Sequence, residues 1–482
     1  MRIFFCELYK LLSKKIFIIC LVVALCINAF TLIYSSAENY NDRTKHNNIE
    51  YYNSLIKNCN SSKKASEYLK KELDIINERL TENSTDKDAL VEKMTLLNDL
   101  ISQQNYINRY DDFINNMQIR ADNQLSFSIF AEPDSFAYYN NIQQTPLDFQ
   151  HLKGVELYAG NNTFAENATQ FQITDYLMIV LVALTCILLF YTERENGLYP
   201  LVRSTKNGRT STIVAKLFAV IAVTVVTTIL FYLSNILITG IYFGFGDMSR
   251  YIQSIGIFMN CSLKISIFEY LILWILGKTL TLCAFSLLFS FCFTAVKASA
   301  KIYGIIVVFL AVEITANLFI EGASAFSFFK YVNIVYFLSN NNLFGEYLNV
   351  NIFSNPVNII MVWTVVATTL ALVGFFGSVT VYPINAYGYT YCEKKDAGKK
   401  ANTYFAYYDI SGKLRECGIV SKNFVYNGQV GLNKKTPSPN TDIFDYYAGA
   451  MTVSEVVYPN QTYYHWSSEN TDYELRLGIY KR

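Results

Sequence analysis

The sequence predicts an all-α polytopic membrane protein with about six transmembrane helices. Of its 482 residues 52% are hydrophobic and only 16% are charged, whereas a soluble domain carries roughly 25% charged residues. The apolar residues gather in runs near the length of about 20 residues that crosses a bilayer. Hydrocarbon offers no partner to an unpaired backbone polar group, so each run is expected to be a helix.

The first run, residues 16–34, follows a flank that contains four basic residues, Arg2, Lys10, Lys14 and Lys15. A basic flank also begins a secretory signal peptide. This run is long for the apolar core of a signal peptide, and the nearest small-residue cleavage sequence, Ser35–Ala37, is a weak one, so we interpret the run as a retained anchor. Five further runs occupy residues 176–191, 217–243, 270–293, 302–319 and 356–381.

The distribution of Lys and Arg among the loops predicts the orientation. The N-terminus and the loops 192–216 and 294–301 are basic, whereas the loops 244–269 and 320–355 contain fewer basic residues. Cytoplasmic loops are enriched in Lys and Arg, which places the N-terminus and the tail after Val381 in the cytoplasm. The formal net charge of +1, split among separate loops, does not favour binding to nucleic acid.

Residues 35–172 are therefore expected outside the cytoplasm, and their middle has the pattern of a helical hairpin. Two apolar stripes with helical spacing are separated by turn-forming residues: Leu69, Leu73, Ile76 and Leu80 in one, and Leu90, Met94, Leu97 and Ile101 in the other. Two such stripes can bury each other as an antiparallel coiled coil. We interpret the segment as a rigid stalk, with a ligand-binding receptor as the alternative.

The other two long polar segments carry weaker signals. The loop 320–355 is dense in aromatic residues, which concentrate at membrane interfaces, and this favours short helices that anchor it at the outer interface. The tail, residues 382–482, is rich in Tyr and contains short alternations such as Thr403–Tyr408, so a small β-containing domain is an open interpretation.

No catalytic, metal or cofactor site is predicted. The sequence lacks the G-x-x-x-x-G-K-[ST] loop that cradles ATP phosphates. Its three histidines, His46, His151 and His465, lie far apart in the chain, and its ten cysteines form no C-x-x-C pair.

Two ionisable residues fall inside apolar runs. Lys278 lies in the outer half of the fourth run and Glu313 in the outer half of the fifth. Because a charged side chain facing lipid costs several kcal/mol, both are expected to face the bundle interior. Their similar depth leads to the hypothesis that they form an interhelical ion pair.

The loop between the second and third runs is the most informative stretch. Acidic residues come first, then a glycine, an apolar turn and a basic end; the residues that define this order are Glu193, Glu195, Gly197, Leu201, Arg203, Thr205, Gly208 and Arg209. This order fits a short amphipathic helix that presents Leu201 to a partner or to lipid headgroups. The spacing fits an ordinary basic cytoplasmic loop equally well.

This loop resembles that of bacterial ABC-2 type transporter permeases, in which an acid precedes a glycine and a Ser-Thr-x-x-Gly-Arg segment precedes a lysine at the start of the third helix. The opening segment Glu7–Leu12, followed by Lys14 and Lys15, is similar to the amphipathic elbow helix of that family. The segment Ser266–Leu271 is similar to the entry to its fourth helix. The resemblance covers residues 1–381 and leaves out the tail.

The resemblance implies a mechanism. Two permease subunits, identical or different, would form a path through the cell membrane of a bacterium and export a peptide, lipid or hydrophobic drug. Separate ABC ATPase subunits would use the ATP, and the Glu193–Arg209 segment would be the coupling helix that docks on them. The alternative function is a membrane sensor whose extracytoplasmic hairpin binds a ligand and whose tail signals. A membrane enzyme is disfavoured because no set of nucleophile, base and metal ligands converges.

Overall fold

We describe the fold from a computed structural model. It describes residues 2–61, 65–81, 86–126, 132, 134–191, 210–296, 299–321, 326–339 and 343–384, and five tail segments, 403–408, 414–420, 452–458, 461–468 and 471–479. The chain divides into two compact units, Met1–Tyr382 and Pro383–Arg482, and each is described by itself.

The first unit is mostly helical, and among its described residues five helices are long and apolar enough to cross a membrane. They are α2 (Lys15–Glu38), α11 (Ile173–Cys186) with its continuation η3 (Ile187–Tyr191), α14 (Thr210–Phe243), α15 (Ile267–Ala295) and α19 (Ile359–Ile384). The predicted crossing at 302–319 falls within α16 (Ser299–Phe319), whose described apolar stretch is the shorter Val308–Phe319. The prediction of a polytopic helical membrane protein is confirmed, and a sixth crossing stays a prediction.

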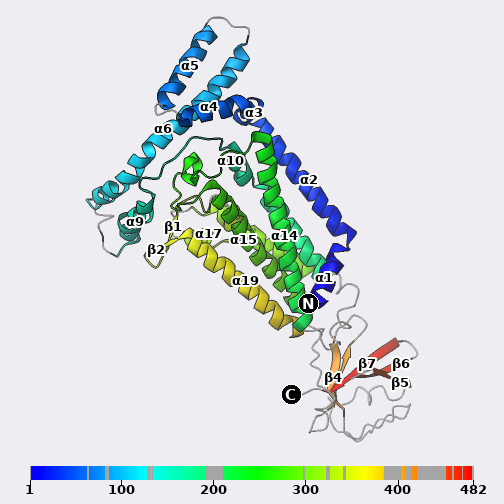
Figure 1. Cartoon of the computed structure of the whole chain (residues 1–482). Coiled ribbons are helices and arrows are strands. Elements are labelled where there is room, and N and C mark those ends of the chain that lie inside the picture. The colour runs from blue at the N-terminus through cyan, green and yellow to red at the C-terminus, as the bar shows by residue number, and fades with distance from the viewer. Residues whose placement is uncertain are drawn as a thin grey trace. The chain divides into compact units, whose positions relative to one another are not determined.

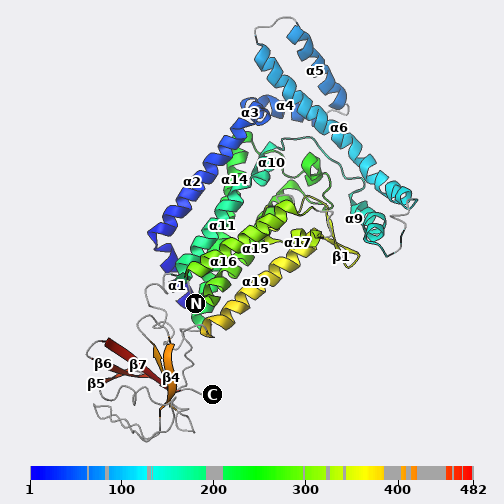
Figure 2. The same cartoon turned by 180° about the vertical axis from the view of Figure 1, so that it is seen from behind.

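The burial of these helices separates the centre of the bundle from its edges. In α14 and in α15, 56% of the residues in the most apolar 18-residue stretch are buried, whereas the share is 22% in α2 and 28% in α19. Figures 1 and 2 show α2 and α19 on opposite flanks of α14 and α15. Because both edge helices are apolar all round, their exposed sides are suited to face lipid.

Close backbone approach holds α19 to the centre. A Cβ atom on Gly374 would lie 2.6 Å from the backbone carbonyl carbon of Leu287 in α15, so only glycine permits this distance. About three helical turns away along α19, the indole of Trp363 donates a 2.9 Å hydrogen bond to Thr281 of α15. Glycine and polar contacts of this kind are how helices associate in a membrane, where lipid removes the hydrophobic driving force.

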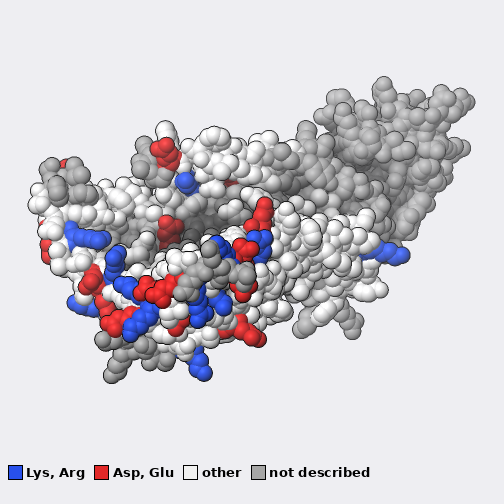
Figure 3. Space-filling model, turned by 90° about the horizontal axis from the view of Figure 1, so that it is seen from above, with Lys and Arg blue, Asp and Glu red and all other residues white. Residues whose placement is uncertain are grey.

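A group of polar helices projects from one end of the bundle. It consists of α3 (Tyr40–Asn47), α4 (Ile49–Ser61), α5 (Ala65–Thr81) and the long α6 (Lys87–Gln124). Viewed onto this end, the described acidic and basic side chains gather over it with both signs intermixed (Figure 3). A solvated surface of mixed charge is typical of a part that lies outside the membrane.

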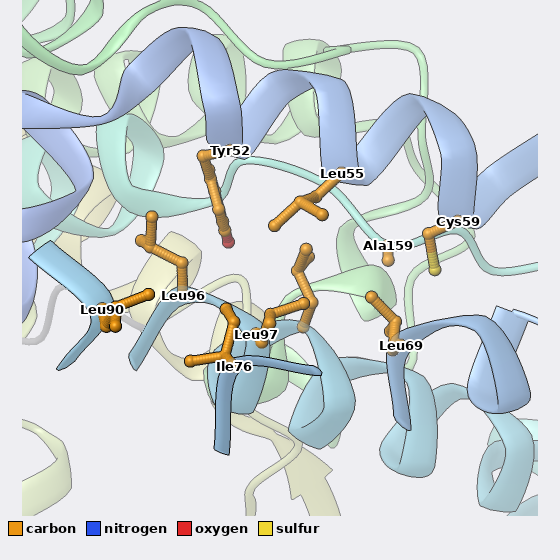
Figure 4. Close-up of a cluster of buried hydrophobic side chains, with 10 residues drawn as sticks. Tyr52, Leu55, Cys59, Leu69, Ile76, Leu90, Leu96, Leu97 and Ala159 are labelled. Carbon is orange, nitrogen blue, oxygen red and sulfur yellow. The ribbon is translucent and has the colours of Figure 1, made fainter. Parts of the chain in front are cut away.

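One hydrophobic cluster holds α4, α5 and α6 together (Figure 4). All eight residues of the two predicted stripes take part in it: Leu69, Ile76, Leu90 and Leu97 are buried, and the other four are partly buried against them. The sequence did not indicate that α4 adds Tyr52, Leu55 and Cys59 to the same cluster. The α5–α6 pair therefore packs on a third helix that leads back to α2.

Short elements complete this end. A chain of small turns follows α6: α8 (Phe136–Tyr138), the π-helix η1 (Tyr139–Gln144), α9 (Thr145–Phe149) and η2 (Gln150–Leu152). The helix α10 (Thr163–Gln170) precedes α11, and the 3₁₀ turns η4 (Ile252–Ser254) and η5 (Gly256–Phe258) lie between α14 and α15. A capping box of Ser266 and Glu269 begins α15 and satisfies backbone donors that the first helical turn leaves open.

The aromatic loop 320–355 contains the expected short helices, α17 (Ser327–Tyr331) and α18 (Ile334–Ser339), and also an antiparallel hairpin of β1 (Asn349–Ile352) and β2 (Asn355–Asn358). Its aromatic rings divide into two groups. Phe326 and Phe329 are exposed, as an interfacial anchor requires, whereas Phe337 is buried. Among the rings of this loop that the structure describes, the most exposed is Phe353 at the hairpin tip, which is 94% exposed and has a positive φ of 50°.

The second unit contains a five-stranded antiparallel sheet in the order β4-β3-β7-β6-β5. Its strands are β3 (Thr403–Tyr408), β4 (Leu414–Val420), β5 (Thr452–Tyr458), β6 (Gln461–Ser468) and β7 (Thr471–Ile479). The alternation at Thr403–Tyr408 forms β3, which pairs with β7 so that Phe405 lies opposite Leu477.

The cluster shared by α4, α5 and α6 predicts a stability effect. Leu97→Ala is expected to destabilise this group of helices by about 2–5 kcal/mol, because it removes a buried side chain and leaves a cavity. The exposed Ile75→Ala is the matched control and should change stability by less than about 0.5 kcal/mol. Thermal unfolding of the purified chain in detergent measures both, and equal melting temperatures for the two variants would contradict the described packing.

Candidate functional site

Two buried polar centres lie at opposite ends of the α11–η3 rod (residues 173–191). The first, here the outer polar centre, surrounds an ion pair in which Lys278 of α15 donates to Asp175 of α11 at 3.0 Å. Each residue is only 3% exposed. Tyr232 of α14 donates its hydroxyl to the same carboxylate, and Lys278 also donates to the carbonyl of Leu338 in α18. The pair therefore connects four helices.

Aromatic rings enclose the ammonium of Lys278. Its Nζ lies 5.8 Å from the ring centre of Tyr232 and 6.0 Å from that of Trp274, and these two rings meet edge to face. Aromatic faces attract cations most strongly where water is excluded. Asp175 lies in the first turn of α11, where the positive end of the helix dipole favours a carboxylate. The surroundings thus stabilise both charges at a depth where either one alone would be costly.

A neutral triangle next to the ion pair ties α2 to the same place. Asn28 of α2 donates to Asn235 of α14 at 2.6 Å, Asn235 donates to Thr174 at 2.8 Å, and Thr174 donates back to Asn28 at 2.7 Å. All three residues are fully buried. Since Thr174 directly precedes Asp175, the start of α11 is bonded to α2, α14 and α15 within two residues.

The outer polar centre corrects the predicted Lys278–Glu313 ion pair. Lys278 does lie buried in the bundle, but its carboxylate partner is Asp175. The side chain of Glu313 instead accepts a 3.1 Å hydrogen bond from the backbone N–H of Ile334 at the start of α18. Asp175 was missed because the second apolar run was taken to begin at Tyr176, directly after the aspartate, and only ionisable residues inside the runs were considered.

The second centre, here the inner ion pair, joins Glu7 of α1 (Arg2–Leu12) to Lys216 of α14 at 2.8 Å. Lys216 is completely buried and Glu7 is 5% exposed. Lys10 of the same helix also contacts the Glu7 carboxylate, at 3.2 Å. The amphipathic helix α1 is thereby attached to the bundle through a buried charge.

The inner ion pair also holds the end of the α11–η3 rod. Lys216 donates to the carbonyl of Leu189 at 3.0 Å, and Lys14 donates to the carbonyl of Leu188 at 3.3 Å. Both carbonyls belong to η3, a π-helical turn. The last carbonyls of a helix have no partner within it and favour cations, and π-helical turns occur frequently at functional sites.

The predicted coupling residues begin directly after this point. Glu193, Glu195, Gly197, Leu201, Arg203, Thr205, Gly208 and Arg209 all lie outside the described residues. The chain on either side is described: η3 ends at Tyr191 and α14 begins at Thr210. Lys216 lies in the α14 flank, near the start of the third spanning helix, and bonds to the other flank through the Leu189 carbonyl of η3.

At the opposite end of the bundle a buried arginine joins the loops. Arg250 donates to the carbonyl of Tyr158 at 2.9 Å and to the side chain of Asn162 at 2.8 Å. A Cβ atom on Gly160 would lie 2.3 Å from its guanidinium carbon, so a side chain at this position would displace the guanidinium from its present place. Burial lowers the pKa of Arg250. The loop after α14 is thus fixed to the segment that leads into α10 and α11.

Several carboxylates gather where α3, α6 and α10 meet. Asp99 contacts Lys45 at 3.5 Å, and Asp42 accepts a 3.0 Å hydrogen bond from Asn167. Burial raises the pKa of Glu166 and of Asp42, nearby Asp99 raises both further, and Lys45 opposes the change. Within the described residues no group of three His, Cys, Asp or Glu side chains is arranged to hold a metal ion.

Comparison with known proteins adds no family assignment. No protein-family model, curated protein or solved structure matches the chain. The fold and the two polar centres define a polytopic helical membrane protein, and its function is argued below from these features.

The outer polar centre predicts strong coupling between two mutations. Asp175→Asn leaves the Lys278 ammonium buried without a counter-charge and is expected to cost about 3–5 kcal/mol of stability. Lys278→Met leaves the carboxylate alone and should cost a similar amount. The double variant Asp175→Asn/Lys278→Met removes both charges and should unfold at a higher temperature than either single variant. Additive losses in a thermal unfolding series would show that the two groups do not form a pair.

The carboxylate cluster predicts a pH dependence. Because the folded chain raises the pKa of Glu166, it binds this proton more tightly than the unfolded chain does, and stability falls as pH rises above the ordinary pKa. Glu166→Gln should remove this loss, so the variant should melt above the wild type at neutral pH and close to it in acid. The exposed Glu78→Gln is the control and should follow the wild type. A Glu166→Gln curve parallel to the wild-type curve at all pH values would contradict the assignment.

Proposed function

We propose that this chain is the permease subunit of a bacterial ABC exporter. In this proposal it spans the cell membrane with its N-terminus in the cytoplasm, pairs with a second permease subunit, identical or different, and uses ATP through separate ABC ATPase subunits. The exported substrate is a peptide, a lipid or a hydrophobic drug. The observation that carries the proposal is the α11–η3 rod, which is bonded at both ends and continues directly into the predicted coupling segment, residues 193–209.

The inner ion pair supports the coupling role of that segment. A loop can pass movement to a bundle only if its flanks are attached to rigid elements. One flank of the segment is η3, whose carbonyls bond to Lys14 and Lys216, and the other is the start of α14, which contains Lys216 itself. The glutamate of the elbow helix, Glu7, completes this connection. A displacement of the segment would therefore move α1, α11 and α14 together.

The outer polar centre supports a transport role for the other end. It joins α2, α11, α14 and α15 through polar contacts with well-defined geometry. Ionisable residues inside membrane segments commonly mark substrate paths or switching elements. Rigid-body movement of the rod would strain these contacts first, which makes them the natural place for the opposite side of the path to open or close.

Co-purification with the ATPase tests the proposal. We expect the neighbouring reading frame to encode an ABC ATPase, and we expect the chain to co-elute with this ATPase and to change its rate of ATP hydrolysis. Exchanging the predicted coupling charges in the variant Glu195→Arg/Arg209→Glu should abolish co-elution while leaving the melting temperature unchanged. Lys297→Glu, in the other short basic loop, is the control and should co-elute normally.

Normal co-elution and ATPase coupling of the exchanged variant would show that the segment is not the coupling helix. Failure of the wild-type chain to bind the ATPase would contradict the exporter function and favour a sensor whose output does not require ATP hydrolysis.

A further inference from the structure

A buried extended segment connects the projecting helices to the bundle. Residues 158–162, here the strap, lie between the turns that follow α6 and the start of α10, and they form neither helix nor strand. Residues 159–162 are nevertheless buried. Because such a segment has no regular hydrogen bonding of its own, its backbone groups must find partners on the elements around it.

Helices α4 and α6 supply the partners on one side of the strap. Asn60 of α4 donates a 2.9 Å hydrogen bond to the carbonyl of Ala159. Gln103 of α6 accepts a 3.1 Å hydrogen bond from the backbone N–H of Gly160, and its amide donates to Tyr52 of α4 at 3.2 Å. The side chain of Ala159 lies in the hydrophobic cluster that α4, α5 and α6 share (Figure 4). The strap is therefore packed as part of the same group as these helices.

The bundle supplies the partners on the other side. Asn161 donates a 2.8 Å hydrogen bond to the carbonyl of Phe243, the last residue of α14. A Cβ atom on Gly246 would lie 2.3 Å from the carbonyl oxygen of Asn161, so backbone packs directly on backbone here. Arg250, in the same loop after α14, bonds to both ends of the strap. Neighbouring residues of the strap are thus bonded to the projecting helices and to the bundle.

Helix α10 connects the strap to the outer polar centre. It begins directly after the strap, and only two residues separate its end at Gln170 from the start of α11. Thr174 and Asp175, which belong to the outer polar centre, are the second and third residues of α11. Since two residues span at most about 7 Å, this connection has little slack, and a displacement of α10 reaches Asp175.

We propose that the strap is a mechanical link through which α4 and α6 control the geometry of the outer polar centre. A load on the projecting helices, such as a partner that binds them, pulls on residues 159 and 160, shifts α10 and moves Asp175 relative to Lys278. The helical group then acts as an input to the bundle and not only as a stalk. The link lies within the fold of this chain, so it stands or fails independently of the proposed ATPase partner.

Hydrogen–deuterium exchange of the full chain in lipid nanodiscs tests the proposal. Gln103→Ala removes the acceptor of the Gly160 N–H. We expect exchange to become about fivefold faster in the peptides that cover 163–170 and 173–178, because the loss of one hydrogen bond shifts a local opening equilibrium by about that factor. Gln118→Ala, also in α6, removes an exposed hydrogen bond to Asp122 of the same helix. It is the matched control and should exchange as the wild type does.

A variant on another helix separates the link from a local defect in α6. Asn60→Ala in α4 removes the donor to the Ala159 carbonyl and should accelerate exchange in the same two peptides, while the α5 peptide 65–81 exchanges as in the wild type. Faster exchange confined to 158–162 in both Gln103→Ala and Asn60→Ala would overturn the proposal, as would an equal effect of Gln118→Ala.

The reverse direction provides a second measurement. Energetic coupling between two sites is reciprocal, so weakening the outer polar centre should loosen the strap. The double variant Asp175→Asn/Lys278→Met should therefore accelerate exchange in the peptide that covers 158–162. Wild-type exchange of the strap in this double variant would also overturn the proposal.

Discussion

The bundle depends on the pairing of two lysines that lie in helices apolar enough to cross a membrane. Lys216 and Lys278 are both buried, and a buried ammonium in such surroundings is stable only with a close counter-charge and further hydrogen bonds. Each finds its partner on another helix, Glu7 on α1 and Asp175 on α11. Satisfying these two charges therefore fixes which helices are neighbours and at what depth they meet.

The same two ion pairs provide a route by which a displacement at one end of the bundle can reach the other end. Lys278 bonds near the beginning of α11 and Lys216 bonds to the Leu189 carbonyl of η3, so the α11–η3 rod is attached to its neighbours at both ends. Apolar contacts between helices tolerate sliding more readily than hydrogen-bonded charges do. A displacement of η3 is thus expected to reach Asp175 as movement of the whole rod. The proposed coupling segment joins the rod at its η3 end.

The sequence analysis predicted the parts of the fold that depend on local patterns. Apolar runs identified the spanning helices, and leucine spacing identified eight of the residues that α5 and α6 contribute to their shared cluster, although it left out the buried Leu96 and Leu100. Local patterns contain no information about which charges meet. Asp175 lay just outside its apolar run and was overlooked, and Glu7 was assigned only to an amphipathic helix. The partner of Lys278 was predicted wrongly because similar depth in two helices does not make those helices neighbours.

Other features could not be predicted from a single sequence. The contribution of α4 to the cluster depends on the fold of the chain around it, and the π-helical turn η3 reads in the sequence as an ordinary apolar run, Ile187–Tyr191. The polar triangle joins Asn28, Thr174 and Asn235, residues that are more than 60 positions apart in sequence. Asparagine within an apolar run indicates that a polar partner exists and does not identify it.

Hydrogen–deuterium exchange of the Lys216→Met variant in lipid nanodiscs tests most directly whether the α11–η3 rod acts as one body. The account predicts faster exchange than in the wild type both in the peptide that covers 187–191 and in the peptide that covers 173–178, although the mutation lies only at the η3 end. Faster exchange confined to 187–191, with wild-type protection at 173–178, would show that the two ends move independently and would contradict the account.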